Sequence, residues 1–241
     1  MRNFLLLKVR LTWYIFIFLF IFLVLIFVLP KQNFNTGALA LFSVNSFLYG
    51  FYLSPILSSQ KSRIEDMHKV ARSEANAIFE MVLDLKRLPI ELQDSLRGRF
   101  DVYLKTCAKQ RKPAQGEKEY EELITECVNY TGRYKEQIDK LLDKLVDNQS
   151  NRTQFSMLLA NKIYSHEWAI MAVLYGITTG FIITINTGHI LIYQLIAGFL
   201  AAGLTMLLLI LVKLSTLTHK KAHQAWNPYK RLLETSYYSV D

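Results

Sequence analysis

The stretch FSVNSFLYGFYLSPILSSQKSR, residues 42–63, decides how this chain folds. It is apolar and long enough to cross a bilayer, yet polar side chains interrupt it. These are Ser43, Asn45, Ser46 and Ser54. Lipid tails offer such groups no hydrogen-bonding partner, so a polar stripe on a membrane-spanning helix usually faces protein or water. The stretch is therefore a candidate pore helix.

Four apolar segments of the 241-residue chain approach or exceed the roughly 20 residues that a helix needs to span a bilayer. We predict spans at about residues 11–29, 38–57, 167–186 and 189–214. Basic residues precede the first span, as in a secretory signal. Its apolar run is longer than that of a signal, however, and no small-x-small cleavage site follows it. We interpret it as an uncleaved anchor.

The spans divide the chain into four parts. Two membrane hairpins, residues 1–57 and 166–214, flank a central segment, residues 58–165, and a tail follows at residues 215–241. The central segment has helical spacing of its apolar residues and no convincing period-two alternation. The predicted fold class is all-α: an integral membrane protein with four transmembrane helices and a helical cytoplasmic bundle between spans 2 and 3.

Four helices are expected within the central segment. The first continues from span 2 and ends at Pro89, because proline cannot continue a helix. The second covers residues 90–110 and the third residues 118–147. An Asn/Gln/Ser break at 148–151 precedes a fourth helix, residues 153–165, which leads into span 3.

Lysine and arginine are unevenly distributed about the predicted spans. Both tails and the start of the central segment carry them, whereas the two short connections within the hairpins have one and none. We therefore predict a multi-pass protein of the cell inner (plasma) membrane. The positive-inside rule places both of its termini and its central segment on the cytoplasmic side. Residues 61–165 carry 19 Lys or Arg and 17 Asp or Glu, so most of the formal charge of +8 lies near the membrane. That pattern suits anionic lipid headgroups and not nucleic acid.

No pattern typical of a catalytic or metal site is found in the sequence. There is no Gly-rich phosphate loop, no CxxC pair and no HExxH, so we expect no enzyme, no cofactor and no metal site. Glu74, Glu80 and Asp84 have Lys or Arg neighbours, and we interpret them as solvated helix faces with paired charges. Asn76 is a candidate for facing a central vestibule. Cys107 lies in the predicted cytoplasmic segment, as does the second cysteine, and both are expected to be reduced.

Two further signals concern packing. Gly176 and Gly180 form a GxxxG pair in span 3, and Gly198 and Ala202 form a small-xxx-small pair in span 4. Such pairs let helix backbones approach closely, but the sequence leaves their partners open. The aromatic residues of the tail, among them Trp226, fit either anchoring at the membrane interface or docking on the cytoplasmic bundle.

One face of span 2 carries Ser43, Phe47 and Phe51, which recur at intervals of four. If several copies surround an axis, rings of Phe make a hydrophobic constriction that gates by expelling water. The positive edges of the rings lower the cost of passing an anion, although the alternative that both rings face lipid stays open. Further along, Lys61 and Arg63 are either residues that orient the span or cationic rings at an inner mouth, and the two roles are compatible.

The string Ser46-Phe47-x-x-Gly50-Phe51-Tyr52-x-Ser54, followed by Arg63, resembles the second-span neck segment of the bestrophin channels. The layout is also similar, with two N-terminal spans, a helical cytoplasmic stretch, two closely joined C-terminal spans and a tail. Three short strings look closer still to the bestrophin-like branch of bacterial four-span proteins. They are SEANA at 73–77, LP at 88–89 and NPY at 227–229.

The resemblance implies a pentameric ion channel with Phe47 and Phe51 as successive neck rings. Residues that would line or support the neck are Asn45, Ser46, Gly50 and Ser54. Ser43 stands where the channels usually carry a bulky apolar residue, which suggests a shorter or wetter neck. The calcium-responsive channels carry an acidic cluster after the fourth span, whereas this tail has no acidic residue before Glu234, so calcium gating is not expected.

We therefore predict an oligomeric, bestrophin-like channel that passes small anions and whose partners are the lipid bilayer, further copies of the chain and small ions. The alternative is a membrane-anchored helical sensor or scaffold protein that binds a ligand or partner through its cytoplasmic bundle, for which an even mixture of charges over long helices is typical. A mere anchor, however, needs no polar side chains in span 2.

Overall fold

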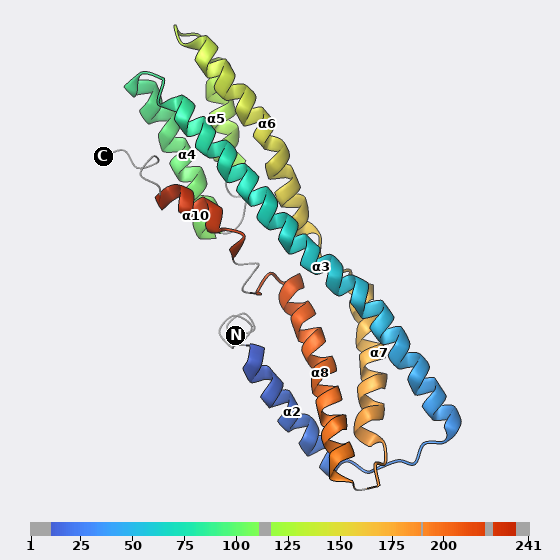
Figure 1. The fold of residues 1–241 in the computed structure, drawn as a ribbon. Helices are drawn as coiled ribbons and strands as arrows, with labels where there is room; N and C mark the ends of the chain where they lie inside the picture. Colours follow the sequence, from blue (N-terminus) through green and yellow to red (C-terminus); the bar gives the residue numbers. More distant parts are fainter. Residues whose placement is uncertain (1–10, 111–116, 189, 220–223, 235–241) are drawn as a thin grey trace. The chain divides into compact units, whose positions relative to one another are not determined.

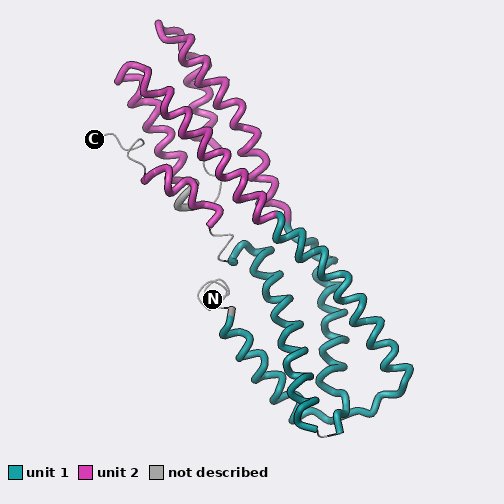
Figure 2. The backbone as a smooth tube through the Cα atoms, viewed as in Figure 1, with its two compact units in different colours: residues 1–62, 162–220 teal, residues 63–161, 221–241 magenta. Residues whose placement is uncertain are grey.

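The computed structural model describes residues 11–110, 117–188, 190–219 and 224–234. Within these residues the secondary structure is α-helical apart from one isolated β-bridge, so the predicted all-α class is confirmed (Figure 1). The chain forms two compact units (Figure 2). Unit 1 comprises residues 1–62 and 162–220, and unit 2 comprises residues 63–161 and 221–241.

Unit 1 contains α2 (Leu11–Val28), the first part of α3 (Thr36–Leu85), α7 (Ser165–Thr184) and α8 (Leu191–Ser215). Helix α8 packs against both α2 and α7 (Figure 1). One core cluster joins α2, α7 and α8 around the buried Ile26 and Ala201. A second joins α3, α7 and α8 around Tyr49, Met171 and Leu211. The second cluster holds the part of α3 that carries the predicted neck.

Small residues let α2 and α8 approach closely. A Cβ atom added at Gly198 would come within 2.8 Å of Leu23 Cδ2, so α2 is the partner of the small-residue pair in α8. Gly176 and Gly180 of α7 differ, because a Cβ at either would meet no atom within 4 Å among the described residues.

The start of α3 is fixed by contacts with the end of α7. Gln32 N donates a hydrogen bond to Thr184 O (2.8 Å), and Asn186 N donates one to Gln32 O (3.0 Å). Asn35 Oδ1 then accepts a hydrogen bond from Ala38 N (2.8 Å), as a helix N-cap does. The chain therefore enters α3 beside the end of α7.

Three stretches of the described chain are long and apolar enough to cross a membrane: Thr36–Leu85, Lys135–Thr184 and Leu191–Ser215. In α3 no charged residue precedes Lys61, so the apolar part is its first half. The apolar part of α2, Thr12–Val28, is shorter. The chain is a membrane protein on this evidence, and a fourth span at α2 stays a prediction.

Unit 2 is a bundle of the second part of α3 with α4 (Ile90–Gln110), α5 (Glu117–Asn129), α6 (Lys135–Ala160) and α10 (Asn227–Glu234). Helix α10 packs on α4, and α5 packs on α4 and α6. Just before α10, the ring of Trp226 meets the ring of Phe155 edge-on, with centroids 5.1 Å apart. Of the two interpretations of the tail aromatic residues, docking on the bundle is the one that these contacts support.

Three of the predicted helix boundaries in the central segment were wrong. The helix expected at 153–165 is the last part of α6, which ends at Ala160, and α7 begins only at Ser165. The expected helix at 118–147 is divided between α5 and α6, because the chain turns at Gly132, where a Cβ would collide with the ring of Tyr130. The break expected at 148–151 lies inside α6. There Asn148 is buried and its Nδ2 donates a hydrogen bond to Tyr120 Oη (3.0 Å), so tertiary contacts outweigh a low helix propensity.

Cys127 is a free, buried cysteine on α5. Burial raises the pKa of its thiol to about 11, so the reactive thiolate is scarce at neutral pH. The side chain of Cys107 lies outside the described residues.

Candidate functional site

The face of α3 predicted to line a pore is exposed in the single chain. We call this set the exposed row: Ser43, Phe47, Gly50, Phe51 and Ser54. Phe47 and Phe51 are 68% and 71% exposed, and their rings stack with centroids 6.0 Å apart. Ser43 Oγ donates a hydrogen bond to Leu39 O (3.0 Å) within its own helix. The row thus presents two adjacent aromatic rings with a hydroxyl at either end.

Asn45 lies on a different face of α3, toward α7. Its Nδ2 donates hydrogen bonds to Thr178 Oγ1 (2.8 Å) and to Leu174 O (3.1 Å). Thr178 Oγ1 in turn donates to Leu174 O (2.8 Å). These contacts fit the support role given to Asn45 and not the pore-lining one, because they tie α3 to α7 and so hold the exposed row in one orientation.

Ser46 borders an apolar pocket of about 620 Å³ between α3, α7 and α8. Its buried Oγ makes no hydrogen bond to any described residue, and neither does the buried hydroxyl of the neighbouring Tyr49. Unsatisfied hydroxyls are costly in an apolar setting. Ser46 therefore lies outside the exposed row, and its role as a residue that lines or supports the neck stays a prediction.

The two basic residues assigned to an inner mouth differ in their surroundings. Lys61 is exposed, whereas Arg63 is buried at 4% exposure. Arg63 Nε donates to Leu158 O (2.5 Å) and Nη2 donates to Leu159 O (2.9 Å). Both carbonyls belong to the last turn of α6, where a cation is favourable. Arg63 thus has a structural role in the single chain, and its part in an inner mouth stays a prediction. Of the two basic residues, Lys61 is the one that is exposed.

The sequence interpretation missed a buried polar cluster in unit 2. Glu74 is not on a solvated face as expected: it is 2% exposed, and its two carboxylate oxygens accept hydrogen bonds from Tyr103 Oη and Tyr229 Oη. Arg152 Nε lies 3.2 Å from Tyr103 Oη and donates to it. The cluster therefore joins α3, α4, α6 and α10 at one point.

A signal for this burial exists in the sequence. Glu74 lies within the apolar stripe of α3, one helical turn from the buried Val70, Ala71 and Ile78. A carboxylate in such a stripe must find donors, and the tyrosines of α4 and of the tail supply them. Glu80 and Asp84 are more exposed and pair with Lys144, in agreement with the interpretation of these two residues as paired surface charges.

Burial raises the pKa of Glu74, and the hydrogen bonds from the two tyrosines and the charge of Arg152 oppose that rise without cancelling it. The carboxyl group of Glu74 therefore stays protonated to a higher pH in the folded chain than in the unfolded chain. Its contribution to stability is largest below the ordinary glutamate pKa and falls as the pH rises through the raised one.

We expect the Glu74→Gln variant to lose this part of the pH dependence. A glutamine amide can accept from one tyrosine and donate to the other, as a protonated glutamate does. Melting temperatures measured from pH 4 to pH 8 should fall less steeply for the variant than for the wild type. Glu80→Gln, an exposed carboxylate on the same helix, is the control and should follow the wild type. If the melting temperatures of Glu74→Gln and the wild type fell in parallel, Glu74 would not be the source of this pH dependence.

Residues 11–220 match the model of one protein family, described as Bestrophin-like domain. Comparison with curated proteins and with solved structures gave no match. The matched range contains the exposed row, the contacts of Asn45 and the buried Glu74. The resemblance found in the sequence is confirmed, and the chain belongs to the bestrophin-like family of membrane proteins.

Proposed function

We propose that this protein is an oligomeric channel for small anions, in which five copies place their exposed rows around one axis. The observation that carries the proposal is the exposed row itself. Its two phenylalanines are exposed on the single chain, while Asn45, on another face of the same helix, is hydrogen-bonded to α7. Membership of the bestrophin-like family supports an ion channel and an oligomer.

In such an assembly Phe47 and Phe51 form a hydrophobic neck that opens and closes by wetting and drying. The positively polarised ring edges favour an anion over a cation. Lys61, exposed on the same helix, adds a ring of charge that raises the local anion concentration. We further propose that the chain crosses the inner membrane four times, with α2 as the first span and both termini on the cytoplasmic side. We also propose that gating does not use calcium.

The proposal is tested by particle symmetry and by ion flux. Protein purified in mild detergent and imaged down the membrane normal should show a five-fold ring with the exposed rows at its centre. Liposomes containing it should pass chloride faster than potassium. A monomer that passes neither ion would contradict the proposal. It would favour the membrane-anchored sensor or scaffold, for which the helical bundle of unit 2 would be the binding module.

A further inference from the structure

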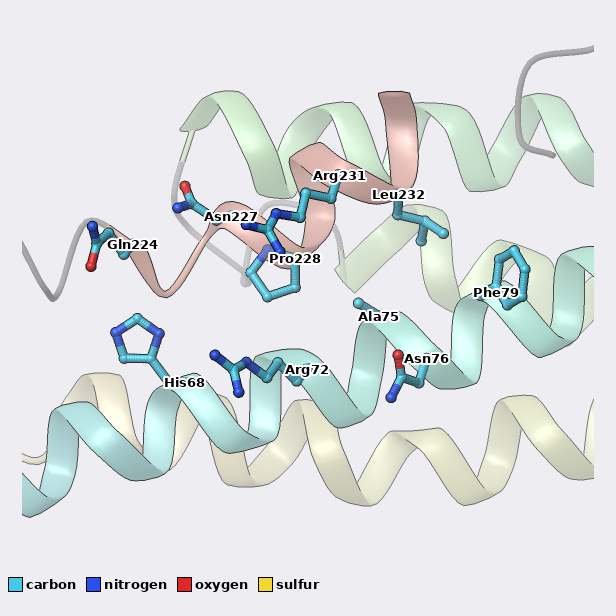
Figure 3. Close-up of a pocket in the computed structure, with 10 residues that line it drawn as sticks. All are labelled: His68, Arg72, Ala75, Asn76, Phe79, Gln224, Asn227, Pro228, Arg231 and Leu232. Carbon is cyan, nitrogen blue, oxygen red and sulfur yellow. The ribbon is translucent and has the colours of Figure 1, made fainter. Parts of the chain in front are cut away.

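Unit 2 has a pocket of about 550 Å³ between α3 and the segment that contains α10 (Figure 3). Figure 3 shows the side chains of α3 on one wall and those of residues 224–232 on the other. Two strings noted in the sequence, SEANA and NPY, contribute Asn76 and Asn227 to opposite walls. The pocket size is in the range of small-molecule sites.

Among the described residues that line the pocket there are two arginines and no acidic residue, so this lining is positively charged. Arg72 extends from α3 and Arg231 from α10, and neither forms an ion pair with a carboxylate among the described residues. Glu74 lies close by in sequence, but its carboxylate is turned into the core and bonded to Tyr103 and Tyr229. No carboxylate in the described part of the chain therefore compensates the charge of the two guanidinium groups.

The other polar lining groups are mainly carboxamides. Asn76, Gln224 and Asn227 each carry an NH₂ group that donates hydrogen bonds. Two guanidinium groups with additional N–H donors match a tetrahedral oxyanion that carries two negative charges, because the planar guanidinium fork pairs with two of its oxygens at once. Phe79 and Leu232 supply an apolar wall for whatever group the anion carries.

The walls of the pocket are fixed by the buried cluster beneath it. Tyr229, on α10 two residues before Arg231, donates its hydroxyl hydrogen bond to Glu74, two residues after Arg72 on α3. The two arginines are thus carried by helices that are already joined, so binding an anion need not order either helix. We propose that this pocket binds a phosphate group, as a phosphomonoester or a diphosphate.

Inorganic pyrophosphate is the first probe. Titrated calorimetrically into the full chain in detergent, it should bind once per chain, and an increase in NaCl should weaken the binding. Arg72→Gln and Arg231→Gln should each weaken it about ten- to hundredfold, as expected for the loss of charge-assisted hydrogen bonds. Lys230→Gln removes the same charge from the same helix outside the pocket and should change the affinity less than about twofold.

A second arm distinguishes a soluble phosphate from a lipid headgroup. The melting temperature of the chain is measured in phosphatidylcholine nanodiscs with and without phosphatidic acid, for the wild type and for the Arg72→Gln/Arg231→Gln double variant. Stabilisation that the double variant loses identifies a headgroup source, whereas pyrophosphate binding alone identifies a soluble one.

Absence of both effects in the wild type, or equal losses in Lys230→Gln and the pocket variants, would overturn the proposal. Circular dichroism confirms that the variants fold, which is expected because both arginines are exposed. No ion gradient is used, so these results do not depend on whether the protein conducts.

Discussion

Phe47→Ala, and separately Phe51→Ala, is expected to raise chloride flux into liposomes about tenfold or more. Each substitution removes one ring from every subunit of the proposed neck, which widens the constriction and makes it easier to wet. A fall of about 1.4 kcal/mol in the barrier is enough for a tenfold increase in rate. Fluorescence quenching by chloride, with protein content matched between preparations, measures the change.

Phe20→Ala is the matched control. Phe20 is an exposed phenylalanine of the apolar helix α2 and is 70% exposed, against 68% and 71% for Phe47 and Phe51. If the rings of α3 faced lipid, as an exposed aromatic residue in a membrane helix often does, all three substitutions would behave alike. Equal flux from the three variants would therefore contradict a neck at Phe47 and Phe51.

Local sequence signals predicted the parts of the fold that depend on local chemistry. Helix α4 begins directly after Pro89 and matches the expected range of 90–110, because proline and apolar spacing act within one or two turns. Three members of the exposed row, Ser43, Phe47 and Phe51, were predicted in the same way, from residues that recur at intervals of four. That the row surrounds an axis stays a prediction, because it depends on contacts between copies.

Contacts between distant segments account for what was missed. Arg63 bonds to carbonyl groups 95 and 96 residues away, and Tyr229 bonds to Glu74 across 155 residues. Nothing near these residues in sequence identifies such partners. The charged neighbours of Glu74 suggested a solvated helix face, whereas its position in the apolar stripe of α3 indicated burial, and the second signal was the correct one.

The largest expected loss of stability is that of Arg152→Leu. Arg152 is 3% exposed, its guanidinium carbon lies 3.8 Å from the centre of the Tyr120 ring, and its Nη2 lies 3.0 Å from Glu117 Oε2. Arg152 is also the cation beside the buried carboxylate of Glu74, and removing the cation from a buried charge pair typically costs about 3–5 kcal/mol. For a chain of this length that lowers the melting temperature by about 10 °C.

Arg99→Leu separates the effect of burial from that of losing an arginine. Arg99 also contacts two carboxylates, Glu122 (2.5 Å) and Glu126 (2.6 Å), but its side chain is 39% exposed. Ion pairs in contact with solvent contribute about 1 kcal/mol or less, so this variant should melt within about 3 °C of the wild type. Equal losses of melting temperature for the two variants would show that burial does not increase the contribution of Arg152 to stability.

The cause of the Arg152 effect can be isolated by a second substitution. Without Arg152, the buried carboxylate of Glu74 has no cation near it among the described residues, whereas a glutamine there needs none. Adding Glu74→Gln to Arg152→Leu should therefore restore several degrees of the lost melting temperature, a coupling that a double-mutant cycle measures directly. Strict additivity of the two substitutions would mean that Arg152 stabilises unit 2 through Tyr120 and Glu117 alone, and that Glu74 is satisfied by its two tyrosines.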